Sequence, residues 1–191
     1  KMDFLGLRTL TVIQNAVGMA RKKDPGLDME KIDYNDQDVL NYIGTGKTDG
    51  IFQLESAGMK SFMKELKPHS LEDIIAGISL YRPGPMDFIP QYIRGKNDAS
   101  SITYDCPQLE PILKPTYGCI VYQEQVMQIV RDLAGYTLGR SDLLRRAMSK
   151  KKGDVMQKER QIFVYGDEEA NVPGCIKNGI TRKRRTRSMM K

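Results

Sequence analysis

The chain has 191 residues, 40% of them hydrophobic and 28% charged, which is typical of a soluble globular domain with enough residues to bury a core. No apolar run approaches the ~20 residues that a membrane-spanning helix needs, and the start lacks the basic and apolar segments of a secretory signal. The three cysteines form no CxxC pair, so neither a zinc site nor a disulfide framework is indicated and we expect a cytoplasmic protein.

The excess positive charge belongs to the end of the chain. The net charge is +6, and the last eleven residues hold six Lys or Arg side chains and no acid. Without that segment the 30 basic residues fall to 24, which equals the number of acidic residues. Overall charge is therefore no evidence for nucleic-acid binding by residues 1–180, and only local clusters of cations can be.

Hydrophobic residues recur at helical spacing through most of the chain, which predicts a mainly α protein. Glycine, proline and capping residues divide this pattern into short helices. The predicted helices span residues 7–23, 36–43, 55–66, 70–80, 88–94, 123–133, 139–152 and 154–165. Between them we expect a polar loop over 95–101, an irregular proline-rich connector near 107–115, and a short strand or buried extended run over 117–122.

The first five residues are predicted to form a short strand that Gly6 ends. Side chains alternate between the two faces of a strand, so Lys1 and Asp3 would point the same way. They are either a simple ion pair or a cation and a carboxylate that address a phosphate and a metal ion. The residues alone leave both interpretations open.

Two short motifs are weak indications of chemistry. The stretch Gly44-Thr45-Gly46-Lys47-Thr48 is similar to the end of a P-loop, but Asn41 stands where that motif needs its first glycine, so we predict a flexible turn. His69 is the only histidine and directly precedes Ser70, a candidate N-cap. A loop or capping role is therefore the default interpretation of His69.

Arg82 lies in the stretch Tyr81-Arg82-Pro83-Gly84-Pro85. Two prolines restrict φ and the glycine allows the chain to reverse, so the stretch predicts a rigid bend. The arginine is either a residue held in a defined position or simply exposed where a helix stops.

Residues 139–152 combine an apolar helix face with a dense cluster of cations. Ser141 is predicted to cap this helix after a break at Gly139, and we expect the face with Leu144, Ala147 and Met148 to be buried. The basic side chains that lie elsewhere are Arg145, Arg146, Lys150 and Lys152. They form either a solvated helix end or a phosphate site, since two adjacent guanidinium groups on a packed helix suit phosphate oxygens.

Six blocks of sequence carry a family resemblance. They are Lys1-Met2-Asp3-Phe4-Leu5-Gly6-Leu7-Arg8-Thr9-Leu10, Gly50-Ile51-Phe52-Gln53-Leu54-Glu55-Ser56, Tyr81-Arg82-Pro83-Gly84-Pro85, Tyr122-Gln123-Glu124-Gln125-Val126-Met127, Gly135-Tyr136-Thr137-Leu138-Gly139, and Leu144-Arg145-Arg146-Ala147-Met148 with Lys150-Lys151-Lys152. Each block alone is modest evidence. In this order, over residues 1 to about 180, the chain resembles the alpha subunit of the bacterial replicative DNA polymerase III.

The resemblance implies that residues 1–7 are the last strand of a palm domain and residues 8–180 a fingers domain. The implied fold is mainly α, with a short β remnant of the palm. In that family three palm aspartates hold two Mg²⁺ ions, and Asp3 matches the last of them as a catalytic and metal-binding residue. The other two lie upstream in the family, so we expect the chain by itself to be inactive as a DNA polymerase.

The resemblance also implies roles for the cations. Lys1, Arg145 and Arg146 match residues that hold the triphosphate of the incoming dNTP. Contacts to template–primer DNA have weaker support, and their candidates are Arg82, Lys150, Lys151 and Lys152. For the full-length protein the implied partners are a sliding clamp and other replisome subunits. The resemblance implies no association with a membrane.

The resemblance ends after Ile180. Residues 181–191 form an aberrant basic tail that we expect to be poorly ordered. One DNA sequence that encodes residues 181–187 gives Glu-Lys-Ala-Ala-Asn-Ser-Met when it is read two bases along, which looks like the missing family helix. Our hypothesis is a local frameshift or gene-prediction error, and the alternative is a basic nucleic-acid arm.

Two other classes of protein compete with polymerase fingers. One is a non-catalytic helical module that binds nucleic acid, and the other is a structural domain that binds a protein partner. Salt-dependent DNA binding separates these two classes from each other. The length of the parent open reading frame separates a polymerase from both.

Overall fold

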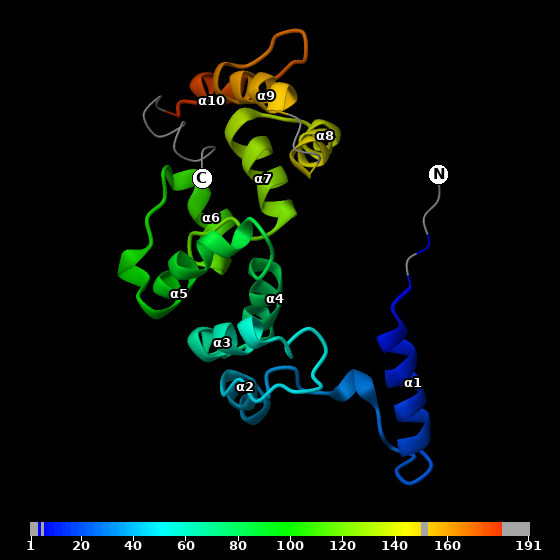
Figure 1. The fold of residues 1–191 in the computed structure, drawn as a ribbon. Helices are drawn as coiled ribbons and strands as arrows, with labels where there is room; N and C mark the ends of the chain where they lie inside the picture. The colour runs from blue at the N-terminus through cyan, green and yellow to red at the C-terminus, as the bar shows by residue number, and fades with distance from the viewer. Residues whose placement is uncertain (1–3, 5, 150–152, 181–191) are drawn as a thin grey trace. The chain divides into compact units, whose positions relative to one another are not determined.

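The computed structural model describes residue 4, residues 6–149 and residues 153–180. Within these residues it contains ten α-helices and no strand, and its β-type pairing is a single bridge between Asp167 and Val172 (Figure 1). The mainly α prediction is confirmed. The predicted strand over residues 1–5 falls outside the described residues, apart from Phe4, and stays a prediction. The chain divides into two compact units, residues 1–36 and residues 37–191.

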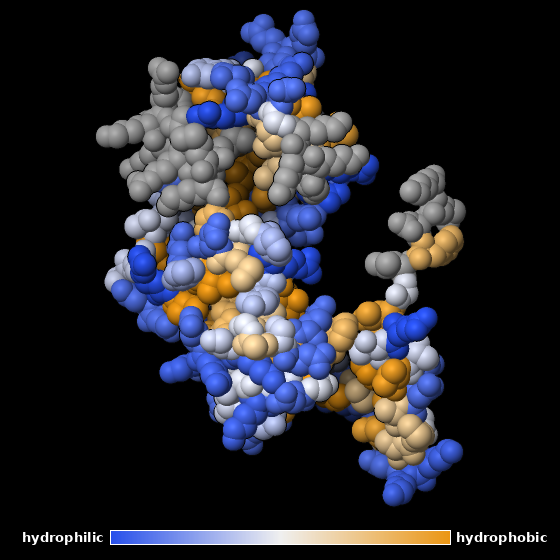
Figure 2. All heavy atoms as spheres, in the orientation of Figure 1, coloured by the Kyte–Doolittle hydropathy of each residue, from blue (hydrophilic) through white to orange (hydrophobic). Residues whose placement is uncertain are grey.

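The first unit contains helix α1 (Arg8–Ala20) and the 3-10 turn η1 (Met29–Lys31). The helix predicted over residues 7–23 is thus confirmed, and its regular part ends before the Lys22-Lys23-Asp24-Pro25 stretch. No residue of α1 is buried, and Leu10 and Ile13 are exposed. Figure 2 shows hydrophobic side chains at the surface of this unit.

The second unit contains the remaining helices. Its α-helices are α2 (Gln37–Gly44), α3 (Ala57–Leu66), α4 (Leu71–Leu80), α5 (Ile89–Asn97), α6 (Glu110–Leu113), α7 (Gln123–Ala134), α8 (Leu138–Ser149), α9 (Gly153–Tyr165) and α10 (Gly174–Lys177). The 3-10 turns are η2 (Pro85–Phe88), η3 (Ala99–Ser101), η4 (Pro107–Leu109) and η5 (Lys114–Thr116). None of the helices in the described part of the chain is both long and apolar enough to cross a bilayer.

Serine caps start two of these helices. The Ser56 and Ser70 hydroxyl groups accept hydrogen bonds from the backbone N–H groups of Met59 and Asp73, and α3 and α4 begin one residue later. The predicted apolar stripe of α3 is fully buried and consists of Met59, Phe62, Met63 and Leu66. The predicted cap at Ser70 and the predicted apolar stripe of α3 are therefore confirmed, whereas the cap at Ser56 was not predicted.

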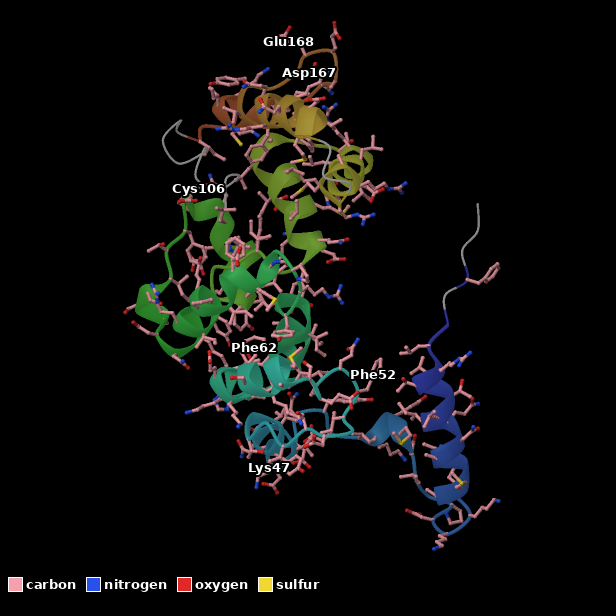
Figure 3. All side chains as sticks on the ribbon, in the orientation of Figure 1. Lys47, Phe52, Phe62, Cys106, Asp167 and Glu168 are labelled. Atoms are coloured by element: carbon pink, nitrogen blue, oxygen red, sulfur yellow. The ribbon has the colours of Figure 1, made fainter. Side chains whose placement is uncertain are left out.

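The second unit has two hydrophobic clusters. One gathers residues of α3, α4 and α5 around Met63 and Leu80, and Phe62 on α3 (labelled in Figure 3) stacks with Tyr81 at 6.1 Å between ring centroids. The other joins α7, α8, α9 and α10 around Val130, Leu144 and Phe163. Helix α8, which carries Arg145 and Arg146, is thus held in place by the packing of its apolar face in this core.

Three connecting segments differ from the predictions. The polar loop expected from residue 95 is instead the end of α5, where Gly95 packs closely against Tyr117. The proline-rich connector is largely helical, because Pro107, Pro111 and Pro115 each lie in the first turn of a short helix, where a missing N–H costs nothing. Residues 117–122 contain no strand and form an irregular run, in which Cys119 is buried, Ile120 is exposed and the other residues are half-buried.

The stretch at residues 44–48 is a turn, as predicted, but it is partly buried. Gly46 has φ +70°, and the fully buried Thr48 donates its hydroxyl hydrogen to the Leu54 carbonyl oxygen at 2.5 Å. Lys47 points outward (Figure 3). In a P-loop the corresponding hydroxyl group binds a metal ion, whereas the Thr48 hydroxyl is buried and hydrogen-bonded to Leu54.

Candidate functional site

Helix α8 presents two adjacent arginines beside a buried anchor. Leu144 is buried in the hydrophobic cluster, whereas the next two residues, Arg145 and Arg146, project from the core. The predicted burial of this face is confirmed for Leu144, while Ala147 is half-buried and Met148 is exposed. The arginine pair therefore stands on a helix whose other side is packed.

One carboxylate holds both guanidinium groups. Arg145 donates from Nε and from one terminal nitrogen to Asp142 Oδ1, at 2.9 and 2.8 Å. Arg146 pairs with the other oxygen, Asp142 Oδ2, at 2.8 Å. The three residues occupy positions i, i+3 and i+4, which lie next to one another on a helix surface. The carboxylate therefore sets the spacing between the two cations.

A second residue attaches the first arginine to the neighbouring helix. The remaining terminal nitrogen of Arg145 donates to Gln123 Oε1 at 2.8 Å, and Gln123 is the first residue of α7. Arg145 is consequently held from two helices, and its side chain is 30% exposed. The Arg146 side chain is 65% exposed, so its guanidinium group is open to a ligand in solution.

The electrostatics of the group favour an anion. The hydrogen bond from Arg145, followed by the charge and hydrogen bond of Arg146, holds the pKa of the Asp142 carboxyl below its ordinary value of 3.8. Asp142 is therefore ionised at neutral pH, and the three residues together carry one net positive charge. Guanidinium groups held in a defined arrangement are suited to charge-assisted hydrogen bonds with phosphate oxygens.

The start of α8 differs from the prediction. The helix begins at Leu138 and not after Ser141, and the Thr137 hydroxyl accepts from the Arg140 N–H at 3.2 Å. Ser141 is buried inside the first turn and donates to the Leu138 carbonyl oxygen at 2.7 Å. Gly139 is part of the helix and does not break it.

Three residues clamp this first turn to α9. Arg140 donates to the Glu159 carboxylate at 3.1 Å, and the Tyr136 hydroxyl donates to the same group at 2.9 Å. The Arg140 guanidinium also lies 5.1 Å from the centre of the Tyr136 ring. Burial, followed by the hydrogen bond to Glu159, raises the pKa of Tyr136, which therefore stays protonated. The clamp fixes the orientation of the helix that carries the arginine pair.

The structure does not join Arg82 to this pair. Arg82 is exposed in the bend after α4, where Gly84 has φ +102° and Tyr81 is held by its stacking on Phe62. The bend adjoins the hydrophobic cluster around Met63 and Leu80, whereas α8 packs in the other hydrophobic cluster. The predicted bend is present, while its rigidity and the DNA role of Arg82 stay predictions.

The other predicted site residues lie outside the described part of the chain. They are Lys1, Asp3, Lys150, Lys151 and Lys152. Within the described residues, no cluster of three His, Cys, Asp or Glu side chains could hold a metal ion. The Mg²⁺ role of Asp3 therefore stays a prediction.

A cavity of about 300 Å³ lies beside α8 but has a different character. Leu144, Met148, Val130 and Phe163 are among its lining residues, and none of the described residues that line it is Lys or Arg. Its walls are mostly apolar, so it cannot bind phosphate in the way that the arginine pair can.

Two members of the site escaped prediction from the sequence. Asp142 is readable in principle, because an acid three and four positions before two arginines is a favourable helical pairing. Gln123 gave no such signal, since its contact with Arg145 depends on how α7 packs against α8. Gln125, two residues further along α7, also gave no signal, because nothing in the sequence indicates that this polar side chain is buried.

Comparison with known proteins agrees with the blocks of resemblance. The family model for the bacterial DNA polymerase III alpha subunit finger domain matches residues 9–171. A DNA polymerase III subunit alpha from Halalkalibacterium halodurans is 51% identical over 167 residues, or 87% of this chain and 15% of the relative. One from Staphylococcus aureus (strain MRSA252) is 52% identical over 171 residues, or 88% of this chain and 16% of the relative.

The matched range contains every described element of the arginine site. Helices α7, α8 and α9 all fall between residues 9 and 171, together with Asp142, Arg145 and Gln123. The chain spans about one sixth of the length of these relatives. The chain belongs to the family of bacterial DNA polymerase III alpha subunit finger domains.

Proposed function

We propose that this chain is the dNTP-binding finger segment of a DNA-directed DNA polymerase, and that Arg145 and Arg146 bind the triphosphate of the incoming nucleotide. The observation that carries the proposal is the arrangement of both guanidinium groups around a single carboxylate on a packed helix. A triphosphate offers several anionic oxygens close together, so two cations at a set spacing can bind it more strongly than two independent ones.

The proposed role of the pair is binding and charge stabilisation. In phosphoryl transfer, negative charge spreads over the phosphoryl oxygens, and positioned cations stabilise that charge. Arg145 is better fixed than Arg146, because Gln123 holds it from a second helix. Arg146 is more exposed and is the cation that a nucleotide would meet first.

The parts of the polymerase site that involve Lys1 and Asp3 remain proposals that rest on family membership. A two-metal site needs more than one carboxylate, and of the family's three aspartates only the one that Asp3 resembles would belong to this chain. We therefore expect no primer extension by the purified 191-residue chain. Measurable extension of a primer by that chain would contradict this expectation. A sliding clamp and other replisome subunits remain expected partners of the full-length protein.

A dNTP titration tests the triphosphate role. In a full-length alpha subunit that carries this finger segment, Arg145→Ala and Arg146→Ala should each raise the apparent KM for dNTP by about tenfold or more, since losing a charge-assisted contact costs about 1.5–3 kcal/mol. Arg131→Ala, at an exposed position on α7, is the matched control and should leave KM unchanged. Unchanged KM in both α8 variants would remove the triphosphate role.

DNA contacts by Arg82 and by Lys150, Lys151 and Lys152 form a separate proposal. Such contacts to the phosphate backbone would weaken with salt and would not depend on base sequence. Replacing one of these cations should reduce the slope of log K against log salt by about one. DNA binding with no effect of the α8 arginines on dNTP use would favour the non-catalytic binding module instead.

A further inference from the structure

We propose that Asp142 is a positioning residue, which holds Arg145 and Arg146 as one preformed phosphate-binding unit. The inference rests on the proposed triphosphate role of the two arginines. Asp142 itself carries the wrong charge to bind a nucleotide phosphate, so its effect must pass through the arginines that it contacts.

The division of contacts between the two carboxylate oxygens is the first argument. Oδ1 accepts two hydrogen bonds from Arg145, and Oδ2 pairs with Arg146. Each guanidinium group therefore has its own oxygen, and the rigid carboxylate fixes the distance between them. Without it, adjacent arginines on a helix would project in different directions, because successive residues are about 100° apart around the axis.

The unequal anchoring of the arginines is the second argument. Gln123 holds Arg145 from α7, so Arg145 keeps one defined contact when Asp142 is lost. Among the described residues, Asp142 is the ion-pair partner of Arg146, whose side chain is 65% exposed. A long exposed arginine has rotamer freedom that a ligand must otherwise remove on binding. The positioning effect should therefore act mainly through Arg146.

The sign of the effect separates positioning from simple charge. Removing a carboxylate next to an anion site lowers repulsion, so Coulomb's law alone predicts tighter dNTP binding by Asp142→Asn. Loss of positioning predicts weaker binding, because two arginines must then be ordered by the nucleotide. The two explanations give opposite changes in the same measured quantity.

The experiment is a single-turnover dNTP titration with a full-length alpha subunit that carries this segment. Asp142→Asn should raise the apparent dissociation constant for dNTP five- to tenfold, while the affinity for template–primer stays unchanged and the protein stays folded at the assay temperature. Asp142→Glu keeps the charge and should recover part of the affinity. Asp132→Asn removes the same charge from an exposed position on α7 and should have less than a twofold effect.

A double-mutant cycle identifies the residue through which Asp142 acts. In an Arg146→Ala background, Asp142→Asn should weaken dNTP binding by less than twofold, because the group that it positions is gone. An unchanged or lowered dissociation constant in Asp142→Asn alone would overturn the inference. If Arg145→Ala and Arg146→Ala were also without effect, the proposed triphosphate role itself would fail. If they weakened binding while Asp142→Asn did not, only the positioning role would fail.

Discussion

Lys96, near the end of α5, forms a buried ion pair with Asp73 on α4. Its Nζ lies 3.1 Å from Asp73 Oδ2, and the side chains are 6% and 4% exposed. Lys96 also donates to the carbonyl oxygens of Leu66 and Lys67 at 2.8 and 2.6 Å, where α3 ends. One ammonium group therefore joins three helices and satisfies backbone acceptors that a helix C-terminus leaves without partners.

Replacing Lys96 by methionine should strongly destabilise the second unit. The variant keeps most of the side-chain volume but leaves a buried carboxylate and two helix-end carbonyl groups without their cation. Breaking a buried pair in this way costs about 3 kcal/mol or more. Urea unfolding followed by circular dichroism should show this loss. Arg94→Met removes a cation from an exposed position on the same helix, and its free energy of unfolding should change by less than about 0.5 kcal/mol.

Gln125 is a buried amide with four partners, and its replacement by leucine should also be costly. Its Oε1 accepts from the backbone N–H groups of Val121 and Tyr122, and its Nε2 donates to Ile112 O and to the Thr116 hydroxyl. Leucine would leave these buried groups unsatisfied, so we expect a loss of about 3 kcal/mol. The test is denaturant unfolding.

The control for this prediction lies on the same helix. Gln128 is exposed on α7, so Gln128→Leu should leave the free energy of unfolding nearly unchanged. Equal losses of unfolding free energy in the two variants would mean that leucine destabilises α7 at either position. The hydrogen bonds of Gln125 would then not explain the loss.

These buried polar groups mark the limit of prediction from the sequence. The cap at Ser70 and the stripe of α3 were predicted, because each depends on residues a few positions apart. The burial of Lys96 was not, since it depends on a carboxylate from another helix, and residues 95–101 therefore looked like a polar loop. Burial of a lysine is rare unless a partner compensates it.

The candidate site also has a part that was predicted from the sequence and a part that was not. Arg145 and Arg146 were identified because two adjacent arginines stand on a helix that also has an apolar face. The contact between Arg145 and Gln123 could not be predicted from the sequence, because it depends on the packing of α7 against α8. The start of α8 was misplaced because Ser141 and Gly139 are typical cap and break residues, but tertiary packing buries Ser141 within the helix.

Gly58 should not accept even a methyl group. A Cβ at this position of α3 would overlap the Tyr81 hydroxyl oxygen and lie 2.9 Å from Tyr81 Cζ. Gly58→Ala should therefore displace the Tyr81 ring from Phe62 and lower stability by about 1–2 kcal/mol, after the usual helix gain of alanine over glycine. Thermal unfolding measures the loss.

A second substitution makes the cause of that loss testable. Tyr81→Phe removes the overlapping oxygen, so the double variant should cost less than the sum of the two single variants. Gly139→Ala on α8 is the control, because a Cβ there meets no atom within 4 Å, and it should stabilise the chain by about 0.5–1 kcal/mol. Additive losses at Gly58 and Tyr81 would contradict the proposed overlap.

The ion pairs of Asp142 should make stability depend on pH in acid. Hydrogen bonds from Arg145 lower the pKa of Asp142 in the folded chain below 3.8. A carboxyl with a lowered folded pKa contributes stability that is complete above its unfolded pKa and is lost as pH falls through the folded pKa. Wild type should therefore be more stable than Asp142→Asn near pH 6, and the difference should disappear as pH falls well below 3.8.

Replacing Arg145 tests whether its contact with Asp142 causes this pH dependence. Arg145→Met removes the largest cause of the lowered pKa, so Asp142→Asn should have a smaller pH-dependent effect in that background. The group is exposed to solvent, and added salt should also reduce the difference. Urea unfolding of the four variants at pH 6 and pH 3 gives the complete comparison. A difference between wild type and Asp142→Asn that grew toward pH 3 would contradict the sign, because protonation can only remove the charge that binds the two arginines.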